Sequence, residues 1–168
     1  NERLRNLSLV DGLTGLNNRR GFMILATSLL KFARRAGYSS SLIYIDLDSL
    51  KFINDTFGHA GGDAALANFA RILTETFRES DIVGRLGGDE FVVLIVDASS
   101  SDLAVMQARL QKNVAGYNQQ VEPEHALSFS MGSIRLDAAS KISMEEFLAQ
   151  ADEAMYRHKL SRKRSKPL

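Results

Sequence analysis

A short glycine-rich, acidic turn constrains the fold of this chain more than any other segment. Residues 87–90, with the sequence Gly-Gly-Asp-Glu, join two apolar segments at 81–86 and 91–96. Both segments have the length and composition of strands, and glycines in the turn between two strands supply the positive φ angles that tight hairpins use. The sequence therefore predicts an antiparallel hairpin with two carboxylates at its tip.

A second acidic pair follows an apolar strand, Leu42–Ile45. Asp46 and Asp48 are two residues apart, so on an extended chain their side chains face the same side, whereas Leu47 faces the opposite layer. Mg²⁺ takes oxygen ligands and is usually held by one or two carboxylates plus substrate phosphates. Two carboxylate pairs in one domain therefore predict a metal site for a polyphosphate. A second interpretation of Asp48 is a cap for the helix that begins nearby.

The remaining pattern predicts a mixed α+β fold. Ser143 and Glu146 have the spacing of a capping box, which favours a helix starting at this point. Residues 127–136 form another predicted strand. Apolar residues recur every three or four positions in four segments, which predicts helices at 22–36, 62–77, 103–117 and 143–155.

Composition excludes several classes of protein. A chain of 168 residues fits one domain that buries roughly 70% of its unfolded surface. The absence of cysteine rules out disulfides and thiolate zinc sites. The net charge of +1 gives no argument for binding nucleic acid. No apolar run is long enough to span a membrane, and no Gly-x-x-x-x-Gly-Lys-Ser/Thr loop is present, which excludes a P-loop nucleotide site.

Four ordered motifs resemble those of the GGDEF family of diguanylate cyclases, which condense two GTP into cyclic di-GMP. The resemblance covers nearly the whole chain, although Gly12 stands where the family usually has proline. The motifs lie at residues 11–20 (Asp-Gly-Leu-Thr-Gly-Leu-Asn-Asn-Arg-Arg), 46–63, 87–91 (Gly-Gly-Asp-Glu-Phe) and 151–159. The resemblance implies a central, mostly antiparallel sheet flanked by helices, as in the nucleotidyl-cyclase and polymerase-palm (ferredoxin-like) architecture.

The resemblance also implies a metal centre and a catalytic group. Asp46, the backbone carbonyl of Leu47 and Asp89 would hold two Mg²⁺ ions in each half-site, with Mn²⁺ as an alternative. Asp89 or Glu90 would remove the proton from the attacking 3′-hydroxyl. Phosphoryl transfer requires in-line positioning and charge neutralisation more than covalent work by the protein.

The substrate contacts implied for GTP divide between base and phosphates. Asn54 and Asp63 would bind guanine, since an amide plus a carboxylate offers both polarities and the carboxylate rejects adenine. The alternatives are a turn residue for Asn54 and a helix N-cap for Asp63. Lys159 and Lys163 would reach phosphate oxygens, and Lys163 stands where the family has arginine, which binds phosphate bidentately. The other implied substrate contacts are Leu50, Lys51, Gly87 and Gly88.

Regulation is implied by Arg78 and Asp81, which match the Arg-x-x-Asp motif that binds cyclic di-GMP as an inhibitor in the family. An ordinary ion pair at a helix end is the alternative interpretation. Each domain of the family offers one GTP half-site, so a homodimer is expected to be required for activity. An upstream sensory or receiver module is the expected partner, with no nucleic acid.

These inferences predict three segments: residues 1–10 as the end of a connecting helix, 11–161 as the GGDEF catalytic domain and 162–168 as a basic tail. The expected location is the cytoplasm, for the domain alone or on a membrane-anchored parent. Two other functions stay open. One is a non-catalytic module that binds GTP or cyclic di-GMP to regulate attached domains. The other is a cyclase with a mixed guanine-adenine product, because Ser49 replaces a residue that is often aromatic or histidine in the family.

Overall fold

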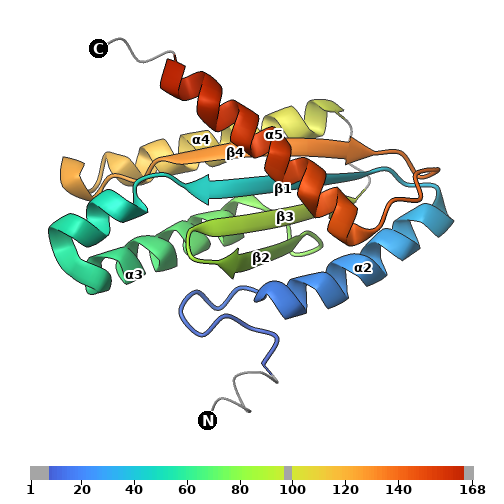
Figure 1. Cartoon of the computed structure of the whole chain (residues 1–168), viewed down its shortest axis with the longest axis horizontal. Coiled ribbons are helices and arrows are strands. Elements are labelled where there is room, and N and C mark those ends of the chain that lie inside the picture. Colours follow the sequence, from blue (N-terminus) through green and yellow to red (C-terminus); the bar gives the residue numbers. More distant parts are fainter. Residues whose placement is uncertain (1–7, 97–99, 165–168) are drawn as a thin grey trace.

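The computed structural model describes residues 8–96 and 100–164, with backbone only at 100–101 and 162–164. A four-stranded sheet has the order β2-β3-β1-β4, and every neighbouring pair is antiparallel (Figure 1). The mostly antiparallel sheet predicted from the sequence is therefore confirmed. The strands are β1 (Ser40–Leu47), β2 (Ile82–Gly87), β3 (Glu90–Val96) and β4 (Phe129–Leu136).

Helices cover both faces of the sheet (Figure 1). Two of them, α2 and α5, pack on one face, and α3 and α4 pack on the other. Strands and helices alternate as βαββαβ after α2, which gives the ferredoxin-like arrangement expected for a palm domain. The helices are α2 (Arg19–Ala36), α3 (Leu50–Thr76), α4 (Ser100–Asn118) and α5 (Met144–Arg164), with a short 3₁₀ helix η1 (Pro123–His125) between α4 and β4.

The central strand β1 divides its side chains between the two layers. Ile43, Ile45 and Leu47 are fully buried toward α3 and α4. Leu42 and Tyr44 are buried toward α2 and α5. Because alternate residues of a strand face opposite sides, the side chains that follow Tyr44 at every second position also face the layer that contains α5.

The capping box predicted at Ser143 is confirmed at atomic level, whereas α2 and α3 begin earlier than predicted, at residues 19 and 50 instead of 22 and 62. The Asn18 side chain accepts a hydrogen bond from the backbone N–H of Gly21 at 2.9 Å, which caps α2. Ser143 and Glu146 form the reciprocal capping box, with N···O distances of 2.9 and 3.1 Å. Each cap satisfies backbone N–H groups that have no partner inside the helix.

The ends of the chain differ in part from expectation. Of the helix predicted for residues 1–10, residues 1–7 lie outside the described part, and residues 8–10 are not helical because Val10 forms a bridge with Asn17. At the other end α5 continues through residue 164, so residues 162–164 extend the helix, and 165–168 lie outside the described part. Within the described residues, no helix combines the length and apolarity needed to cross a membrane.

Candidate active site

The two predicted acidic pairs meet at one end of the sheet. Asp46 is the direct cross-strand partner of Glu90, and residues paired in this way project to the same face. The backbone N–H of Leu47 donates to the carbonyl of Asp89 at 3.0 Å, which holds the hairpin tip against the end of β1. The prediction that these carboxylates share one site is therefore supported by the fold.

A lysine from α5 completes this cluster. Lys159 Nζ lies 3.2 Å from Asp46 Oδ2 and 3.5 Å from Asp48 Oδ1. Asp48 also accepts a hydrogen bond from the buried Ser130 hydroxyl at 2.7 Å. The alternative that Asp48 caps α3 is wrong, because Ser49 occupies the N-cap position and its side chain makes no capping bond.

The electrostatics of the cluster are those of crowded carboxylates balanced by one cation. Burial and the neighbouring charge of Asp89 raise the pKa of Asp46, although the hydrogen bond and charge of Lys159 act in the opposite direction. Burial by itself would lower the pKa of Lys159, but pairing with Asp46 and Asp48 outweighs burial and raises that pKa. The ammonium therefore remains charged at neutral pH and offsets the repulsion between the aspartates.

One oxygen of this cluster is suited to a cation. Asp46 Oδ1 is buried and has no hydrogen-bond partner, which is costly unless another positive group binds it. Among the described residues, no group of three or more His, Cys, Asp or Glu could hold a metal alone. The donor set therefore fits Mg²⁺, which accepts a few carboxylates and takes the rest of its shell from phosphates and water.

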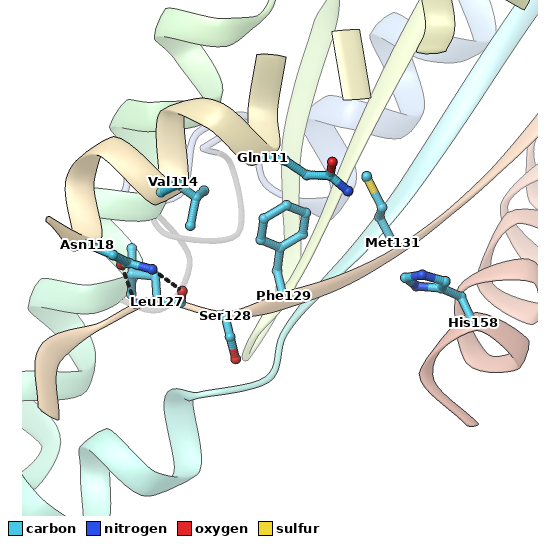
Figure 2. Close-up of a pocket in the computed structure, with 9 residues that line it drawn as sticks. Gln111, Val114, Asn118, Leu127, Ser128, Phe129, Met131 and His158 are labelled. Carbon is cyan, nitrogen blue, oxygen red and sulfur yellow. Dashed lines mark hydrogen bonds between the residues drawn. The ribbon is translucent and has the colours of Figure 1, made fainter. Parts of the chain in front are cut away.

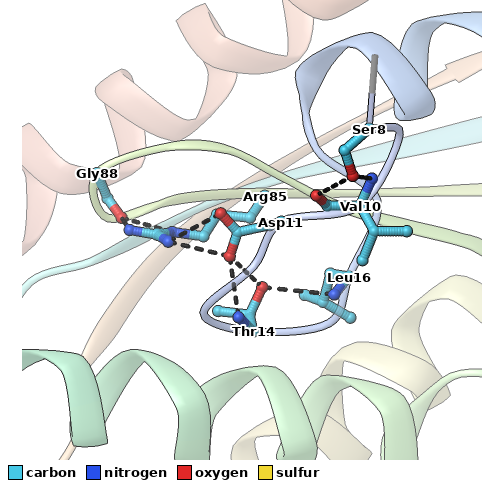
Figure 3. A network of polar contacts seen from close by, with 7 residues as sticks. All are labelled: Ser8, Val10, Asp11, Thr14, Leu16, Arg85 and Gly88. Atoms are coloured by element: carbon cyan, nitrogen blue, oxygen red, sulfur yellow. Dashed lines mark hydrogen bonds and ion pairs between the residues drawn. The ribbon is translucent and has the colours of Figure 1, made fainter. Parts of the chain in front are cut away.

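Glycines shape the tip that carries Asp89. Gly87 and Gly88 have φ angles of 150° and 46°, in the region that favours glycine, so the predicted positive φ angles are confirmed. The Arg85 side chain lies between Gly88 and Asp11 and holds the turn in place (Figure 3). Its guanidinium donates to the Gly88 carbonyl at 2.8 and 3.0 Å and reaches the Asp11 carboxylate at 3.1 and 3.2 Å.

The Asp11 carboxylate links this turn to the loop that precedes α2. It also accepts hydrogen bonds from the Thr14 backbone N–H at 3.0 Å and from the Thr14 hydroxyl at 2.6 Å. Burial by itself would raise the pKa of Asp11, but the bonds from Thr14 and Arg85 outweigh burial and lower it. Asp11 and Thr14 therefore fix the Gly87-Gly88 turn through Arg85, a role that sequence reasoning did not assign to Asp11 or Arg85.

The two predicted base-binding residues lie on α3, on either side of a kink. Gly58 has φ 72° and ψ −178°, which breaks the helix between Asn54 and Asp63. The alternatives for both residues are wrong, because Asn54 and Asp63 lie within α3 and neither is a turn residue or an N-cap. Asn54 packs on Gly62, where an added Cβ would lie 1.8 Å from Asn54 Oδ1. Asp63 is exposed beside it.

The other predicted contacts are distributed around this centre. Leu50 and Lys51 are the first residues of α3, after Asp48 and the N-cap Ser49, and Leu50 is half-buried whereas Lys51 is exposed. The backbone at Lys163 continues α5, one turn beyond Lys159, but its side chain lies outside the described part. Tyr44 is an unpredicted neighbour: burial, followed by the negative charges of Glu90 and Asp152, raises the pKa of its hydroxyl.

A family model described as "Diguanylate cyclase, GGDEF domain" matches residues 8–165. The chain belongs to this family. It is 34% identical over 153 residues to the diguanylate cyclase DgcP of Escherichia coli, covering 90% of this chain and 45% of that protein. It is 37% identical over 158 residues to the response regulator PleD of Caulobacter vibrioides, covering 92% of this chain and 35% of that protein. The chain thus spans less than half of either relative.

A solved structure agrees with this assignment. The GGDEF domain of DgcB from Caulobacter crescentus, determined in complex with c-di-GMP, superposes with a TM-score of 0.82 at 25% identity, covering 92% of this chain and 91% of that chain. The α+β palm-like fold of this GGDEF domain is therefore established by both its own topology and its neighbour.

The Arg-x-x-Asp segment of this GGDEF domain forms a turn between α3 and β2. Asp81 accepts a hydrogen bond from the Arg78 backbone N–H at 2.8 Å; among the described ion pairs none joins the two side chains. Burial raises the pKa of Asp81, while the cations Arg78 and Arg109 act to lower it. A cavity of about 350 Å³ is lined by Arg78 and Asp81, whereas Asp46 and Lys159 are not among its lining residues.

A larger cavity of about 500 Å³ lies along the outer side of β4 (Figure 2). Phe129 and Met131 of β4 face it together with Gln111 of α4, and His158 of α5 points in from the other side. No carboxylate and no lysine or arginine lines this cavity. A metal-bound triphosphate would therefore find no carboxylate ligand and no lysine or arginine counter-charge among the residues that line this cavity.

Proposed function

We propose that this GGDEF domain is a diguanylate cyclase that condenses two GTP into cyclic di-GMP and releases pyrophosphate. The observation that carries the proposal is the convergence of Asp46, Asp89 and Lys159 at one end of the sheet. Carboxylates for a metal and a cation for phosphate are both needed for a triphosphate, and here they are already in contact.

The reaction is a nucleotidyl transfer. The 3′-oxygen of one GTP forms a bond to the α-phosphorus of the other, and the bond from that phosphorus to the pyrophosphate oxygen breaks. The 3′-hydroxyl proton passes to the carboxylate of Asp89 or Glu90. In a second transfer, the 3′-oxygen of the other nucleotide attacks the remaining α-phosphorus, which closes the ring and releases the second pyrophosphate.

The metal would be held by Asp46, the Leu47 carbonyl and Asp89, with two Mg²⁺ ions proposed per half-site. When bound, Mg²⁺ neutralises charge on the phosphates and orients them. Lys159 is already charged and faces this position, so it is placed to bind phosphate oxygens, with Lys163 as the proposed second cation. Leu50, Lys51, Gly87 and Gly88 are proposed to border the same nucleotide.

Base selection is assigned to Asn54 and Asp63. The amide of Asn54 is held on Gly62, and the exposed carboxylate of Asp63 is free to accept from the N1–H and amino group of guanine. Adenine lacks the N1 donor, so it would leave that carboxylate unpaired, which is costly.

We further propose that two domains must face one another, because one domain provides one set of GTP-binding residues. Cyclic di-GMP is the proposed feedback ligand at Arg78 and Asp81. Since this chain spans less than half of its curated relatives, we propose an attached sensory or receiver module that brings two domains together.

The test is incubation of the domain with GTP, with ATP, or with both, plus Mg²⁺, and separation of the products. Cyclic di-GMP from GTP alone is the expected result, with a rate per domain that rises with concentration. Asp46→Asn and Asp89→Asn should each reduce turnover by at least about 100-fold, while Asp137→Asn, at the far end of β4, should not. GTP binding without product would instead favour the non-catalytic module, and a mixed product would favour the altered cyclase.

A further inference from the structure

The N-terminal arm of α3 has few contacts of its own. Residues 50–57 precede the break at Gly58, and in this arm only Ile53 is buried. Helices this short are marginal without tertiary packing, and the Ser49 N-cap makes no side-chain bond. Ile53 and the half-buried Leu50 anchor the arm in the core, but Asn54 is only half-buried and Phe57 is exposed, so the position of these two side chains depends on other contacts.

Two adjacent glycines let the arm fold back on the rest of α3. A Cβ on Gly61 would lie 2.5 Å from Phe57 Cβ, and one on Gly62 would lie 1.8 Å from Asn54 Oδ1. Phe57 therefore packs against the backbone of Gly61, and Asn54 packs against the backbone of Gly62. Any movement of Phe57 away from Gly61 would carry Asn54 away from Gly62, because one helical turn connects them.

One face of the Phe57 ring is stacked on a residue from a different part of the chain, although Phe57 stays 38% exposed. The His125 ring stacks on the Phe57 ring, with centroids 4.1 Å apart and planes inclined by 17°. His125 belongs to η1, which is closed by hydrogen bonds from His125 N–H to Glu122 and from Ala126 N–H to Pro123.

The segment after η1 is anchored in its turn. The Asn118 side chain exchanges two hydrogen bonds of 2.8 Å with the backbone of Leu127, which is buried. Behind the stack lies a cavity of about 310 Å³ that is lined by Ile53, Gly61 and His125. The space beside the arm is therefore incompletely filled, and the described aromatic contact of Phe57 is the one with the His125 ring.

We infer that His125 is a positioning residue for base recognition: its ring braces Phe57 and thereby holds Asn54 on Gly62, where it meets guanine. The inference rests on the proposed function of Asn54. It assigns a role in GTP affinity to the connection between α4 and β4, outside the four sequence motifs.

The test compares His125→Gln, which removes the flat ring, with His125→Phe, which keeps it. Calorimetry with Mg²⁺ and a GTP analogue that has a methylene group between its α- and β-phosphates reports affinity without turnover. The Gln variant should bind about two- to tenfold more weakly, the range expected for loss of one aromatic stack, and the Phe variant should restore binding. In turnover assays the Gln variant should show a raised KM with kcat nearly unchanged. Glu124→Ala, an exposed neighbour in η1, is the matched control.

Two further measurements separate a role in base binding from a general loss of structure. Inorganic tripolyphosphate lacks the base, so it should bind the parent and His125→Gln equally. Phe57→Leu removes the stack from the other side and should weaken analogue binding as His125→Gln does, with no further loss in the double variant.

Equal analogue affinity of parent and His125→Gln would overturn the inference, as would a Phe variant that behaves like the Gln variant. Weakened tripolyphosphate binding would overturn it too. If His125→Gln melts below the assay temperature, Phe57→Leu and His125→Phe decide between the same outcomes. A parent domain that binds no analogue and forms no product would refute the proposed function itself, which is a distinguishable result.

Discussion

Lys159 Nζ lies 3.2 Å from Asp46 Oδ2, although the two residues are 113 positions apart in the sequence. The contact joins the C-terminal part of α5 to the end of the central strand. Both partners are largely buried, with exposed side-chain fractions of 29% and 14%, so water screens the pair less than it would at the surface. The lysine offsets the carboxylate charge where we propose that a metal binds.

Replacing Lys159 by Met should therefore destabilise the domain by about 1–3 kcal/mol, because Asp46 would be left near Asp89 without its cation. Added Mg²⁺ should narrow the gap in melting temperature between parent and variant, since the ion supplies the missing charge. Turnover should still be lost, because phosphate oxygens lose a partner. Thermal melts at several Mg²⁺ concentrations check this prediction. Arg157→Met breaks only an exposed pair with Glu153 and is the control; an Mg²⁺-independent gap for Lys159→Met would contradict the idea.

How much of this site the sequence predicts depends on how far apart in the sequence the contacting residues lie. Asp46 and Asp48 face the same side because they are two residues apart on an extended chain, and the glycine turn involves only neighbouring residues. Both features were predictable from strand and turn geometry. The kink at Gly58 was not, because apolar spacing from Leu66 onward indicates a helix but says nothing about a second arm before it. The Asp11–Arg85 pair joins residues 74 positions apart, and no periodicity reports such a contact. The arginine two positions before the glycine turn, within a predicted strand, was the only signal in the sequence.

Asp11 and Arg85 should give the domain a pH-dependent part of its stability. The pKa of Asp11 in the folded domain lies below the usual value of an aspartate. The contribution of Asp11 to stability is therefore present above that usual value and is lost as the pH falls through the folded pKa. At pH 7, Asp11→Asn should reduce the free energy of unfolding by about 1–3 kcal/mol.

Urea melts of parent and Asp11→Asn from pH 7 down to pH 3 measure this difference, which should shrink as the solution becomes acidic. Combination with Arg85→Gln in a double-mutant cycle should give a coupling energy of at least about 0.5 kcal/mol. A pH-independent difference, or fully additive effects, would count against the Asp11–Arg85 contact.

Gly62→Ala should impair GTP binding without unfolding the domain. An added Cβ would lie 1.8 Å from Asn54 Oδ1, so the Asn54 side chain must leave its place on the helix. We expect the KM for GTP to rise by about tenfold, the effect of losing one hydrogen bond to the base. Gly116→Ala in α4 is the control, since nothing lies within 4 Å of its Cβ position; that change should be neutral or slightly stabilising. An unchanged KM for Gly62→Ala would remove Asn54 from the base site.

Asp63→Ala should relax base choice rather than stability. Asp63 lies inside α3 and caps nothing, so the melting temperature should stay close to that of the parent. Losing the acceptor for guanine N1–H should cost about 1–3 kcal/mol in binding GTP and much less in binding ATP. Calorimetric affinities of the parent and Asp63→Ala for GTP and for ATP test whether Asp63 selects the base. A variant that melts early and still prefers GTP would return Asp63 to a purely structural role.

Arg78→Ala should relieve feedback inhibition and leave the initial rate intact. The Arg78 guanidinium is exposed beside a cavity of about 350 Å³ that Asp81 also lines. Arg109 acts on the Asp81 carboxylate as a second cation. Two cations and a carboxylate match the phosphates and guanine edges of cyclic di-GMP, and Asp46 does not line the cavity beside Arg78 and Asp81. The Asp81 carboxylate is held by the Arg78 backbone N–H at 2.8 Å. Truncation of the Arg78 side chain should therefore leave the turn intact.

Calorimetry with cyclic di-GMP should show affinity reduced by at least about tenfold in Arg78→Ala. Arg71→Ala, which changes an exposed arginine of α3, should bind cyclic di-GMP like the parent. Equal affinity in all three proteins would exclude residues 78–81 as the product site.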